Sequence, residues 1–265
     1  MELSIIIVNY NGKLFLKDCI ESIKIYCSSI SYEIIIVDNN SKDGSQEFIK
    51  SNYSEIKLFA EKDNLGFGKA NNLGVNKAIG ENILLLNNDT ILLNDIKPVI
   101  EESKKKENGI IGVKMLDGNK QYTPSVGKFP KPLDLLKLSN LNDRRKEFIT
   151  GNFIRNRYEV DWVSGSFMML KKENWDLVNG FDENFFMYVE DVDLCKRISK
   201  FGKKIIFLSD ITYIHFIGFN ESREIKLITG YKLYSNKHFN LVSSILANIS
   251  LKINYVYKKT FKNIR

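Results

Sequence analysis

The sequence has few of the residues that hold small or extracellular folds together. Only three cysteines occur among its 265 residues, Cys19, Cys27 and Cys195, and none of them stands in a Cys-x-x-Cys pair. An odd number of cysteines without such spacing predicts neither a disulfide framework nor a zinc site. We therefore expect a protein of a reducing, cytoplasmic compartment.

Long apolar runs are also missing. The first residues, MELSIIIVNY, include the acid Glu2, and their apolar run from Ile5 to Val8 is much shorter than a signal peptide or a membrane span requires. We expect no export signal and no transmembrane helix. At 43% hydrophobic and 12% aromatic residues, the chain still has the apolar material for a sizeable core.

Acidic residues are absent from positions 225–265. This segment holds eight basic residues and carries +8, whereas residues 1–224 hold 31 basic and 32 acidic residues and sum to −1. Charge confined to one end favours contact with an anionic surface over a nucleic-acid-binding domain. We expect two helices here that dock on lipid phosphate at a membrane; the alternative is two helices packed on the domain with solvated lysines.

Strand and helix patterns alternate along the first half of the chain. Apolar runs predict strands at residues 3–8, 33–38, 57–60, 83–89 and 109–115, with helices between them. This alternation predicts an α/β fold with a mostly parallel central sheet, right-handed crossovers and helices on both faces.

The second half is less regular. Residues 117–159 have no clean period, which predicts a mobile loop with one short helix. Beyond them we expect a strand over 160–172, a helix over 173–178 and strands over 203–208 and 211–219. A further helix should place Leu194, Ile198 and Phe201 on one face and end at Gly202.

Acidic residues end two of the predicted strands. Asp38 precedes the turn NNSKDGS, and Asp89 ends the run ILLLNND. Ligands of open α/β sheets bind beyond the carboxyl ends of the strands, where Asp38 could accept from a base or ribose and Asp89 could bind Mg²⁺ or Mn²⁺ with substrate phosphates. The alternatives are an ordinary turn in which Asp43 caps the next helix, and an Asx turn at Asp89.

Glycines open the helix after the third strand. In NLGFGKANNLG, Gly66 and Gly68 match the start of a G-x-G-x-x-G fingerprint, but Asn71 replaces the third glycine. Because the run also follows the third strand and not the first, a dinucleotide site is not expected. Its backbone N–H groups and Lys69 could still bind a phosphate; the alternative is an ordinary loop-to-helix junction.

Three acids crowd the start of one helix. MYVEDVDLCKR places Glu190, Asp191 and Asp193 in its first turn, where one or two acids would suffice to complement the helix dipole. Like charges so close raise one another's pKa, which suits a general base; pure capping is the alternative. His215 is either a packed core residue or a ligand for Mn²⁺, and His238 shows no specific pattern.

Taken in order, the segments SIIIVNYNG, VDNNSKDGS, NLGFGKANNLG, LLLNNDT, WVSGSFMMLKKE, GFDENFFMYVEDVDLCKR and HFIGF resemble the family 2 glycosyltransferases, particularly their rhamnosyltransferase-like branch. The ordered set spans residues 4 to 218. The resemblance implies a GT-A fold and transfer from a nucleotide sugar with inversion. It also implies three regions: a nucleotide-sugar-binding α/β half (1–116), an acceptor-binding and catalytic half of the same domain (117–220), and a basic helical tail (221–265).

The resemblance also assigns roles to residues. Asp191 matches the usual catalytic base, with Glu190 beside it, and Asp89 and His215 match metal positions. The expected donor-binding residues are Asn9, Tyr10, Asp38, Asn64, Gly66, Asn72, Asn87 and Asn88. Two positions depart from the family pattern: Asn87 replaces the first Asp of a D-x-D motif, and Asn71 stands where the pattern often has Arg.

Acceptor-binding residues are expected in WVSGS, because an aromatic face and hydroxyl groups suit a pyranose. They are Trp162, Ser164, Gly165 and Ser166, and Trp162 is alternatively a core residue.

The expected function is an inverting glycosyltransferase of surface polysaccharide synthesis, cytoplasmic or peripheral on the inner face of the membrane. It would transfer a sugar from dTDP-rhamnose or a UDP-hexose to a hydroxyl of a glycan or lipid-linked acceptor, with Mg²⁺ or Mn²⁺ as cofactor. One alternative is a sugar-nucleotide nucleotidyltransferase, although VNYNGK lacks a Gly-rich basic loop after the first strand. The other is a non-catalytic nucleotide- or glycan-binding module on the same fold.

Overall fold

The first half of the chain forms parallel βα units. In the computed structural model, which describes residues 1–216 and 223–261 (Phe261 by its backbone only), these units are β1 (Leu3–Asn9), α1 (Lys13–Tyr26), β2 (Tyr32–Asp38), α2 (Ser45–Asn52), β3 (Lys57–Ala60), α3 (Phe67–Asn76) and β4 (Asn82–Asn87). The strands lie in the order β3-β2-β1-β4, and each neighbouring pair is parallel. The strands predicted for this half are confirmed.

Alternate residues of β1 face opposite sides of the sheet. Ile5 and Ile7 pack in one core with Leu16 and Ile20 of α1, whereas Ile6 packs in the other core with Val75 of α3. A strand covered by helices on both faces buries both sets of side chains, and Leu3 and Ile5–Ile7 are fully buried. This is why LSIIIV reads as a continuous apolar run.

The second half extends the same sheet. It contains β5 (Thr90–Leu92), α4 (Lys97–Ser103), β6 (Asn108–Leu116), β11 (Phe167–Lys171), α6 (Lys172–Leu177), α7 (Glu190–Ser199) and β12 (Lys204–His215). The strand order is β3-β2-β1-β4-β11-β6-β12-β5, in which β6 and β12 are parallel and β11 lies antiparallel between β4 and β6. The mostly parallel sheet is confirmed, and it runs through both predicted halves of the domain.

The segment 117–159 is more ordered than predicted. It contains β7 (Tyr122–Thr123), β8 (Val126–Gly127), the 3₁₀ helices η1 (Pro132–Leu136) and η2 (Leu138–Leu141), α5 (Lys146–Thr150) and, at its end, β9 (Arg157–Val160) paired with β12. Phe148, Phe153 and Tyr158 stack edge to face with one another and pack against Phe207. Aromatic pairing across distant residues has no sequence period, so the pattern did not reveal it.

Two predictions need correction in this half. The strand expected over 160–172 is broken by a turn at Ser164–Ser166 into β10 (Trp162–Val163), which pairs with β8, and β11. Phe201 does not share the buried face of α7, because the helix ends at Ser199 and Phe201 is 55% exposed. Gly202 does have the left-handed φ of +74° expected of a helix stop. Residues 217–219 of the strand predicted over 211–219 lie outside the described residues.

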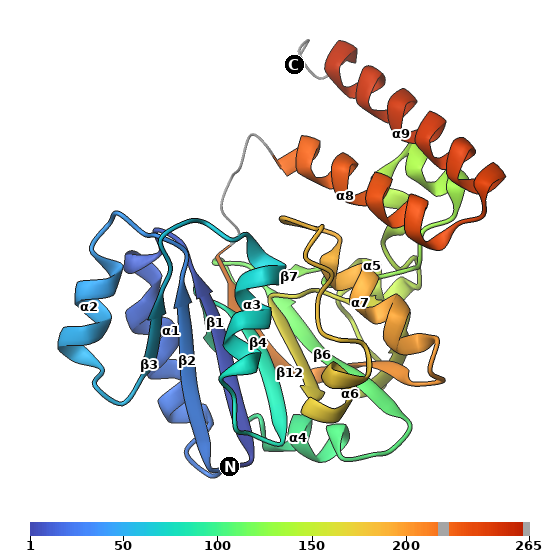
Figure 1. Cartoon of the computed structure of the whole chain (residues 1–265). Helices are drawn as coiled ribbons and strands as arrows, with labels where there is room; N and C mark the ends of the chain where they lie inside the picture. Colours follow the sequence, from blue (N-terminus) through green and yellow to red (C-terminus); the bar gives the residue numbers. More distant parts are fainter. Residues whose placement is uncertain (217–222, 262–265) are drawn as a thin grey trace.

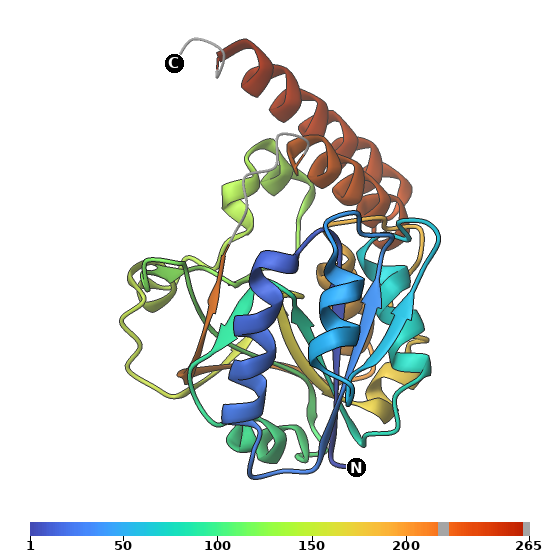
Figure 2. The same cartoon turned by 90° about the vertical axis from the view of Figure 1, so that its left-hand side faces the viewer.

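The tail forms a helical hairpin. α8 (Arg223–His238) and α9 (Leu241–Phe261) contact each other, and α9 also packs on η1. Their buried side chains, Tyr231, Tyr234, Ala247 and Leu251, share a core with Val189 and Val192. Figures 1 and 2 show the hairpin beyond the end of the sheet at which β1 and β2 finish, on the side of α7. The two predicted tail helices are confirmed; Lys262 and Arg265 lie outside the described residues.

No helix within residues 1–216 and 223–261 combines the length and apolarity needed to cross a membrane.

Candidate active site

Polar residues meet at the carboxyl ends of β1, β2 and β4. Asn9 and Asp38 are partners in the strand register, and Asn87 lies opposite Val8 on the other side of β1. Asn9 Nδ2 donates to Asp38 Oδ2 at 2.7 Å, and Asn88 Nδ2 donates to Asn9 Oδ1 at 2.7 Å. Three of the expected donor-binding residues therefore form one hydrogen-bonded chain.

Asp38 is anchored from several directions. Besides Asn9, the backbone N–H of Ser41 and the Gln46 side chain both donate to its Oδ1, at 2.9 and 2.7 Å. Asp38 and Asn9 are fully buried, whereas Tyr10, the next residue after Asn9, is 52% exposed. Tyr10 thus offers a ring at the surface above a rigid polar floor.

The turn after β2 places Asp43 one residue before Gly44, the N-cap residue of α2, so the alternative of Asp43 as the cap is not met. Asp43 Oδ1 accepts from the backbone N–H of Ser45 at 3.1 Å, at the start of α2, and Asp43 Oδ2 accepts from the N–H of Lys13 at 2.8 Å. Asp43 therefore holds the turn and the start of α1, and Asp38 is buried beside it.

The glycine loop before α3 is wedged against the segment that leads to the acidic cluster. Gly66 has a φ of +80°, and a Cβ there would lie 2.3 Å from the carbonyl oxygen of Phe186. The N–H of Phe67 donates to this same carbonyl at 2.9 Å, while Asn64 Oδ1 accepts from the N–H of Gly66. Only glycine allows this close approach, which joins the two halves of the domain.

Asn72 and Asn71 point into protein. Asn72 donates to the carbonyl of Phe181 at 3.0 Å and accepts from its N–H at 2.9 Å, so both of its amide atoms hold that backbone. Asn71 is buried and donates to the Phe67 carbonyl one turn earlier. In this structure Asn72 positions the loop after α6 and has no polar atom directed at the Asn9–Asp38 floor.

A candidate metal centre lies at the end of β4. Asp89 Oδ1 is 3.2 Å from His215 Nε2, and Asn87 Nδ2 is also 3.2 Å from that nitrogen. The strand pairing of Thr90 in β5 with His215 in β12 brings these residues together. His215 is therefore not an isolated core histidine.

The donor set at this centre fits a divalent cation with several open positions. Within the described residues no group of three His, Cys, Asp or Glu side chains could enclose a metal. Two polar atoms here, Asn87 Oδ1 and His215 Nδ1, are nonetheless buried without a hydrogen-bond partner in the described part of the chain. One carboxylate, one imidazole and one amide suit Mn²⁺ or Mg²⁺ that takes its remaining ligands from substrate phosphates and water.

The acidic cluster separates into distinct environments. Asp191 Oδ2 accepts from the N–H of Gly165 at 3.0 Å, and Oδ1 accepts from the N–H of Val192. Glu190 is buried, and its Oε2 has no hydrogen-bond partner in the described residues. Burial raises the pKa of both carboxyls, and the charge of Asp191 raises that of Glu190 further.

The backbone entering α7 is strained. Tyr188 and Val189 have φ values of +69° and +73°, a region that a β-branched residue such as Val rarely adopts. Each residue held there costs roughly 1–3 kcal/mol. This turn directly precedes Glu190 and Asp191. Gly230 of α8 packs closely on Tyr188 and Val189, and this packing helps to hold the turn.

The expected acceptor residues divide into two groups. Gly165 holds Asp191, and a Cβ at this glycine would lie 3.1 Å from the Phe67 ring. Ser166 is buried and shares a hydrogen bond with the Tyr213 hydroxyl at 2.7 Å, with Ser164 3.0 Å away. Trp162 donates to the Lys128 carbonyl and packs against two apolar cores, as its alternative core assignment predicted.

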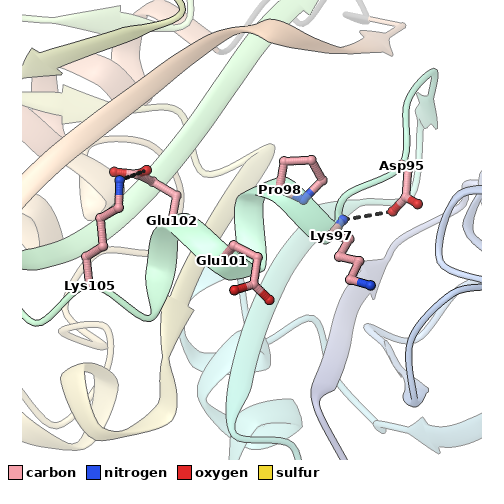
Figure 3. A pocket seen from close by; sticks show the side chains of 6 residues that line it. All are labelled: Asp95, Lys97, Pro98, Glu101, Glu102 and Lys105. Carbon is pink, nitrogen blue, oxygen red and sulfur yellow. Dashed lines mark hydrogen bonds and ion pairs between the residues drawn. The ribbon is translucent and has the colours of Figure 1, made fainter.

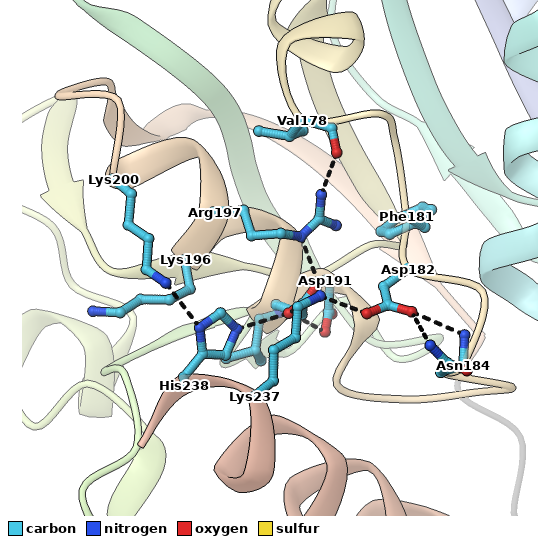
Figure 4. Close-up of polar contacts among 12 residues, drawn as sticks. Val178, Phe181, Asp182, Asn184, Asp191, Lys196, Arg197, Lys200, Lys237 and His238 are labelled. Atoms are coloured by element: carbon cyan, nitrogen blue, oxygen red, sulfur yellow. Dashed lines mark hydrogen bonds and ion pairs between the residues drawn. The ribbon is translucent and has the colours of Figure 1, made fainter. Parts of the chain in front are cut away.

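Asp193 belongs to a separate buried ion cluster, drawn in Figure 4. Its carboxylate binds His238 Nε2 at 2.7 Å, Arg197 Nε at 2.7 Å and Lys237 Nζ at 2.9 Å, and Lys237 also binds Asp182. Burial alone would raise the pKa of Asp193, but the hydrogen bond from His238 and the cations Arg197 and Lys237 lower it to about 2. This cluster ties α8 to α7, and neither Lys237 nor His238 carried a sequence signal for it.

A cavity of about 540 Å³ lies beside α4 (Figure 3). It is away from the strand ends that carry Asn9 and Asp38 (Figure 1). Two of its charged groups pair with each other, Lys105 with Glu102 at 2.6 Å, and Asp95 accepts from the backbone N–H of Lys97. It contains none of the residues predicted for the site.

Sequence comparisons agree on one family. The family model described as Glycosyl transferase family 2 matches residues 4–173, and one described as N-terminal domain of galactosyltransferase matches residues 145–217. The chain is 28% identical over 270 residues to Rhamnosyltransferase WbbL of Escherichia coli (strain K12), covering 91% of this chain and 98% of that protein. It is 24% identical over 202 residues to N-acetylglucosaminyl-diphospho-decaprenol L-rhamnosyltransferase of Mycobacterium tuberculosis, covering 69% of this chain and 66% of that protein.

Solved structures share the fold at low sequence identity. A mannosyltransferase from Pyrobaculum calidifontis in complex with GDP-Man and Mn²⁺ superimposes with a TM-score of 0.65 at 14% identity, covering 98% of this chain and 75% of that chain. S. aureus TarS in complex with UDP-GlcNAc gives a TM-score of 0.60 at 17% identity, covering 98% of this chain and 74% of that chain.

Proposed function

The chain belongs to glycosyltransferase family 2, and from this premise we propose that it transfers a sugar, with inversion, from a nucleotide sugar to a hydroxyl of a lipid-linked glycan acceptor. The two relatives are named as rhamnosyltransferases, which supports rhamnose as the first sugar to test, with dTDP-rhamnose as its donor and a UDP-hexose as the second choice. The fold is the GT-A fold of a sugar transferase, and membership in family 2 argues against the nucleotidyltransferase alternative.

The observation that carries the proposal is the setting of Asp191. The Gly165 N–H orients its carboxylate, and burial raises its pKa toward the range of a working general base. We propose that Asp191 removes the proton of the acceptor hydroxyl as that oxygen bonds to the anomeric carbon. The bond from this carbon to the diphosphate oxygen breaks, and the leaving nucleoside diphosphate keeps the electron pair. Inversion requires one such base, with buried Glu190 supporting its position.

Asp89, His215 and Asn87 are proposed to hold Mg²⁺ or Mn²⁺. When bound, the cation would act as a Lewis acid for the leaving diphosphate. Asp89 contributes the negative charge and His215 a neutral nitrogen, and the close approach of their side chains supports a shared ligand. Mn²⁺ in the structure of the P. calidifontis mannosyltransferase is consistent with this choice.

The donor nucleotide is proposed to lie over the Asp38–Asn9–Asn88 chain, with Tyr10 and the Asn64–Gly66 loop at its sides. Asp38 retains acceptor capacity for a base or ribose beyond its three internal bonds. Ser164, Gly165 and Ser166 would approach the acceptor sugar, and Trp162 would support them from the core. We accordingly keep residues 1–116 as the donor half, 117–220 as the acceptor half and 221–265 as the tail.

The tail is proposed to dock on the anionic inner face of a membrane. α9 exposes a stripe of large apolar side chains at helical spacing: Val242, Ile245, Leu246, Ile249, Ile253, Val256 and Tyr257. Ala247 and Leu251, on the opposite side, are buried against the domain. An apolar stripe next to Lys252 and Lys259, in a segment without acids, matches an interfacial helix on anionic lipid.

The experiment is a transfer assay with dTDP-rhamnose and UDP-hexoses on wild type and Asp191→Asn, with Asp176→Asn on the surface as the matched control. Asp191→Asn should lose at least about 100-fold in kcat, the scale of general-base catalysis, while donor binding by calorimetry stays unchanged. Retained turnover in Asp191→Asn would remove the residue from its proposed role. Donor binding without any turnover in wild type would favour the non-catalytic binding module, which the substitution at Asn87 keeps as the second candidate.

A further inference from the structure

A cavity lies between the segment Asn184–Tyr188 and α8, apart from the nucleotide floor. Its volume is about 130 Å³, and α8 lines it with Ile225, Lys226, Thr229, Gly230 and Leu233. A cavity of this size can hold a compact group such as a phosphate, and it is smaller than the pockets that enclose whole ligands of nucleotide-sugar size.

The lining carries positive charge and no acid. Lys226 is its one charged residue, and its ammonium group lies 3.8 Å from Met187 Sδ and 6.0 Å from the centre of the Phe186 ring. No ion pair involves Lys226 within residues 1–216 and 223–261, whereas Glu224 on the same helix pairs with Lys258 and Glu183 pairs with Lys69. Arg223, at the first turn of α8, adds a second cation 5.9 Å from the Tyr188 ring. A half-buried ammonium without a carboxylate favours an anionic ligand.

The rest of the lining combines apolar and aromatic side chains with the polar groups of Asn184, Tyr188 and Thr229. Phe186 is 49% exposed and Ile225 58% exposed, and Leu233 completes this side. Asn184, Tyr188 and Thr229 can donate hydrogen bonds to phosphate oxygens beside the Lys226 ammonium. One cation, a few polar donors and an apolar side together suit a phosphate joined to a hydrocarbon chain.

The cavity is next to the proposed catalytic base. Tyr188, which lines it, precedes Asp191 by three residues, so their Cα atoms lie within about 11 Å of each other. The neighbouring Phe186 carbonyl also contacts the Gly66 loop. On the outer side, the Lys258–Glu224 ion pair brings the end of α9 to the start of α8. The cavity thus lies between the reaction centre and the helix proposed to contact lipid.

We propose that this cavity binds the diphosphate of a lipid-diphosphate-linked acceptor, with Lys226 as the main cation and Phe186, Ile225 and Leu233 contacting the start of the lipid chain. The inference rests on the proposed function and specifies its acceptor. The sugar attached to the diphosphate would then reach Asp191, and the lipid would leave toward α9.

The kinetic test compares two acceptors that carry the same sugar: N-acetylglucosaminyl-diphosphate-farnesyl, and octyl N-acetylglucosaminide without phosphate. Lys226→Met removes the ammonium group, including its contact with Met187 Sδ, and keeps an unbranched apolar side chain. It should raise KM for the diphosphate-linked acceptor about 10- to 100-fold, the usual effect of losing a charged hydrogen bond, and leave KM and kcat for the octyl glycoside unchanged. Lys226→Arg should retain most of the affinity, and Lys232→Met, on another face of α8, should match wild type.

If Lys226→Met changed KM equally for both acceptors, or for neither, the proposal would be wrong. A binding measurement separates this failure from failure of the proposed function. With EDTA present, farnesyl diphosphate titrated into the protein should bind wild type at least about tenfold more tightly than Lys226→Met, whether or not transfer occurs.

Two further arms distinguish the source of the phosphate. Inorganic diphosphate should bind more weakly than farnesyl diphosphate; equal affinity would remove the lipid chain from the site. Binding to vesicles of anionic phospholipid should be the same in Lys226→Met and wild type. If the variant lost vesicle binding yet kept farnesyl diphosphate affinity, the cation would serve membrane headgroups and the proposal would be wrong.

Discussion

Glu190 and Asp191 are adjacent acids with different surroundings, and this difference separates their roles. Asp191 keeps two backbone N–H donors, which stabilise its charged form, whereas Glu190 has a buried oxygen without a partner in the described residues. Burial raises the pKa of both carboxyls, and the charge of Asp191 raises the pKa of Glu190 further. Asp191 is the better base because its carboxylate is oriented before substrate arrives.

Asn87 sets the charge of the proposed metal centre. It stands beside Asp89 and His215 but contributes a neutral amide. Asn87→Asp should therefore tighten Mn²⁺ binding in the presence of nucleoside diphosphate by about tenfold or more, because a second carboxylate adds charge attraction to the site. Isothermal titration of Mn²⁺ measures this.

The control for Asn87→Asp is Asn94→Asp. In the described residues the Asn94 side chain accepts through its oxygen from Thr212, and an aspartate oxygen can accept the same hydrogen bonds. It should leave Mn²⁺ affinity unchanged. An equal affinity of Asn87→Asp and wild type would contradict the placement of the cation at Asn87.

Among the elements, α8 is the one that supports the catalytic turn. A Cβ at Gly230 would lie 2.7 Å from Val189 Cγ2 and 2.8 Å from the Tyr188 carbonyl, so the helix packs directly on the strained residues before Glu190. The contact is possible because position 230 has no side chain.

Gly230→Ala should destabilise the protein and lower kcat. At an ordinary helix position, replacing Gly by Ala stabilises the folded protein by about 1 kcal/mol. A loss of stability in Gly230→Ala would therefore report the close contact with Val189 and Tyr188. Thermal denaturation and steady-state kinetics measure the two effects, with donor Kd expected to stay constant and Lys232→Ala as the control on the same helix. A higher Tm with unchanged kcat would show that α8 does not hold the turn.

The ion cluster at Asp193 joins α7 and α8 and should make their association depend on pH. The pKa of Asp193 is lowered from 3.8 to about 2, so its charge stabilises the folded state above pH 4 and this contribution is lost as pH falls toward 2. The shift corresponds to about 2 kcal/mol.

Lys237→Met should reduce this acid sensitivity, because Lys237 lowers the pKa of both Asp193 and Asp182. Urea unfolding at pH 5 and at pH 3 gives the measurement: wild type should lose more free energy of unfolding between the two than the variant. Lys232→Met should behave as wild type, and an identical loss in all three proteins would contradict the role of the cluster.

At the scale of the whole molecule, the hairpin gives the protein an apolar face that its own core does not cover. The stripe on α9 from Val242 to Tyr257 is exposed, while Leu251 and Asn254 hold the same helix against the domain, Asn254 through the Leu136 carbonyl. Truncating α9 would remove both its exposed apolar stripe and its packing on the domain. Point substitutions in the stripe separate the two.

Ile249→Asp combined with Ile253→Asp should weaken binding to anionic vesicles at least about 100-fold. In the proposed docking both side chains enter the membrane, and burying an apolar side chain there is worth roughly 1.5–3 kcal/mol. Co-sedimentation measures binding, and transfer to the octyl glycoside checks that the site is intact. Ser243→Asp with Ser244→Asp, which adds the same charge near the start of α9, is the control. Undiminished sedimentation of the isoleucine variant would contradict membrane docking through this stripe.

Local patterns in the sequence determined the order of elements, the parallel strands and most of the candidate site. β1, β2 and β4 are buried on both faces, so their apolar runs are explicit, and a parallel sheet necessarily brings Asn9, Asp38 and Asn87 to one edge. The Glu190–Asp191 pair was visible because its charge exceeds what capping needs. These features depend on neighbours along the chain.

Only the tertiary structure decided which polar groups face one another. It assigned Asn72 to the Phe181 backbone, gave Asp193 the partners Lys237 and His238, and packed Gly230 on the turn at Val189. It also placed β11 antiparallel between β4 and β6. Such contacts join residues tens of positions apart, and hydrogen bonding and steric fit act on distance in space, which a sequence period does not encode.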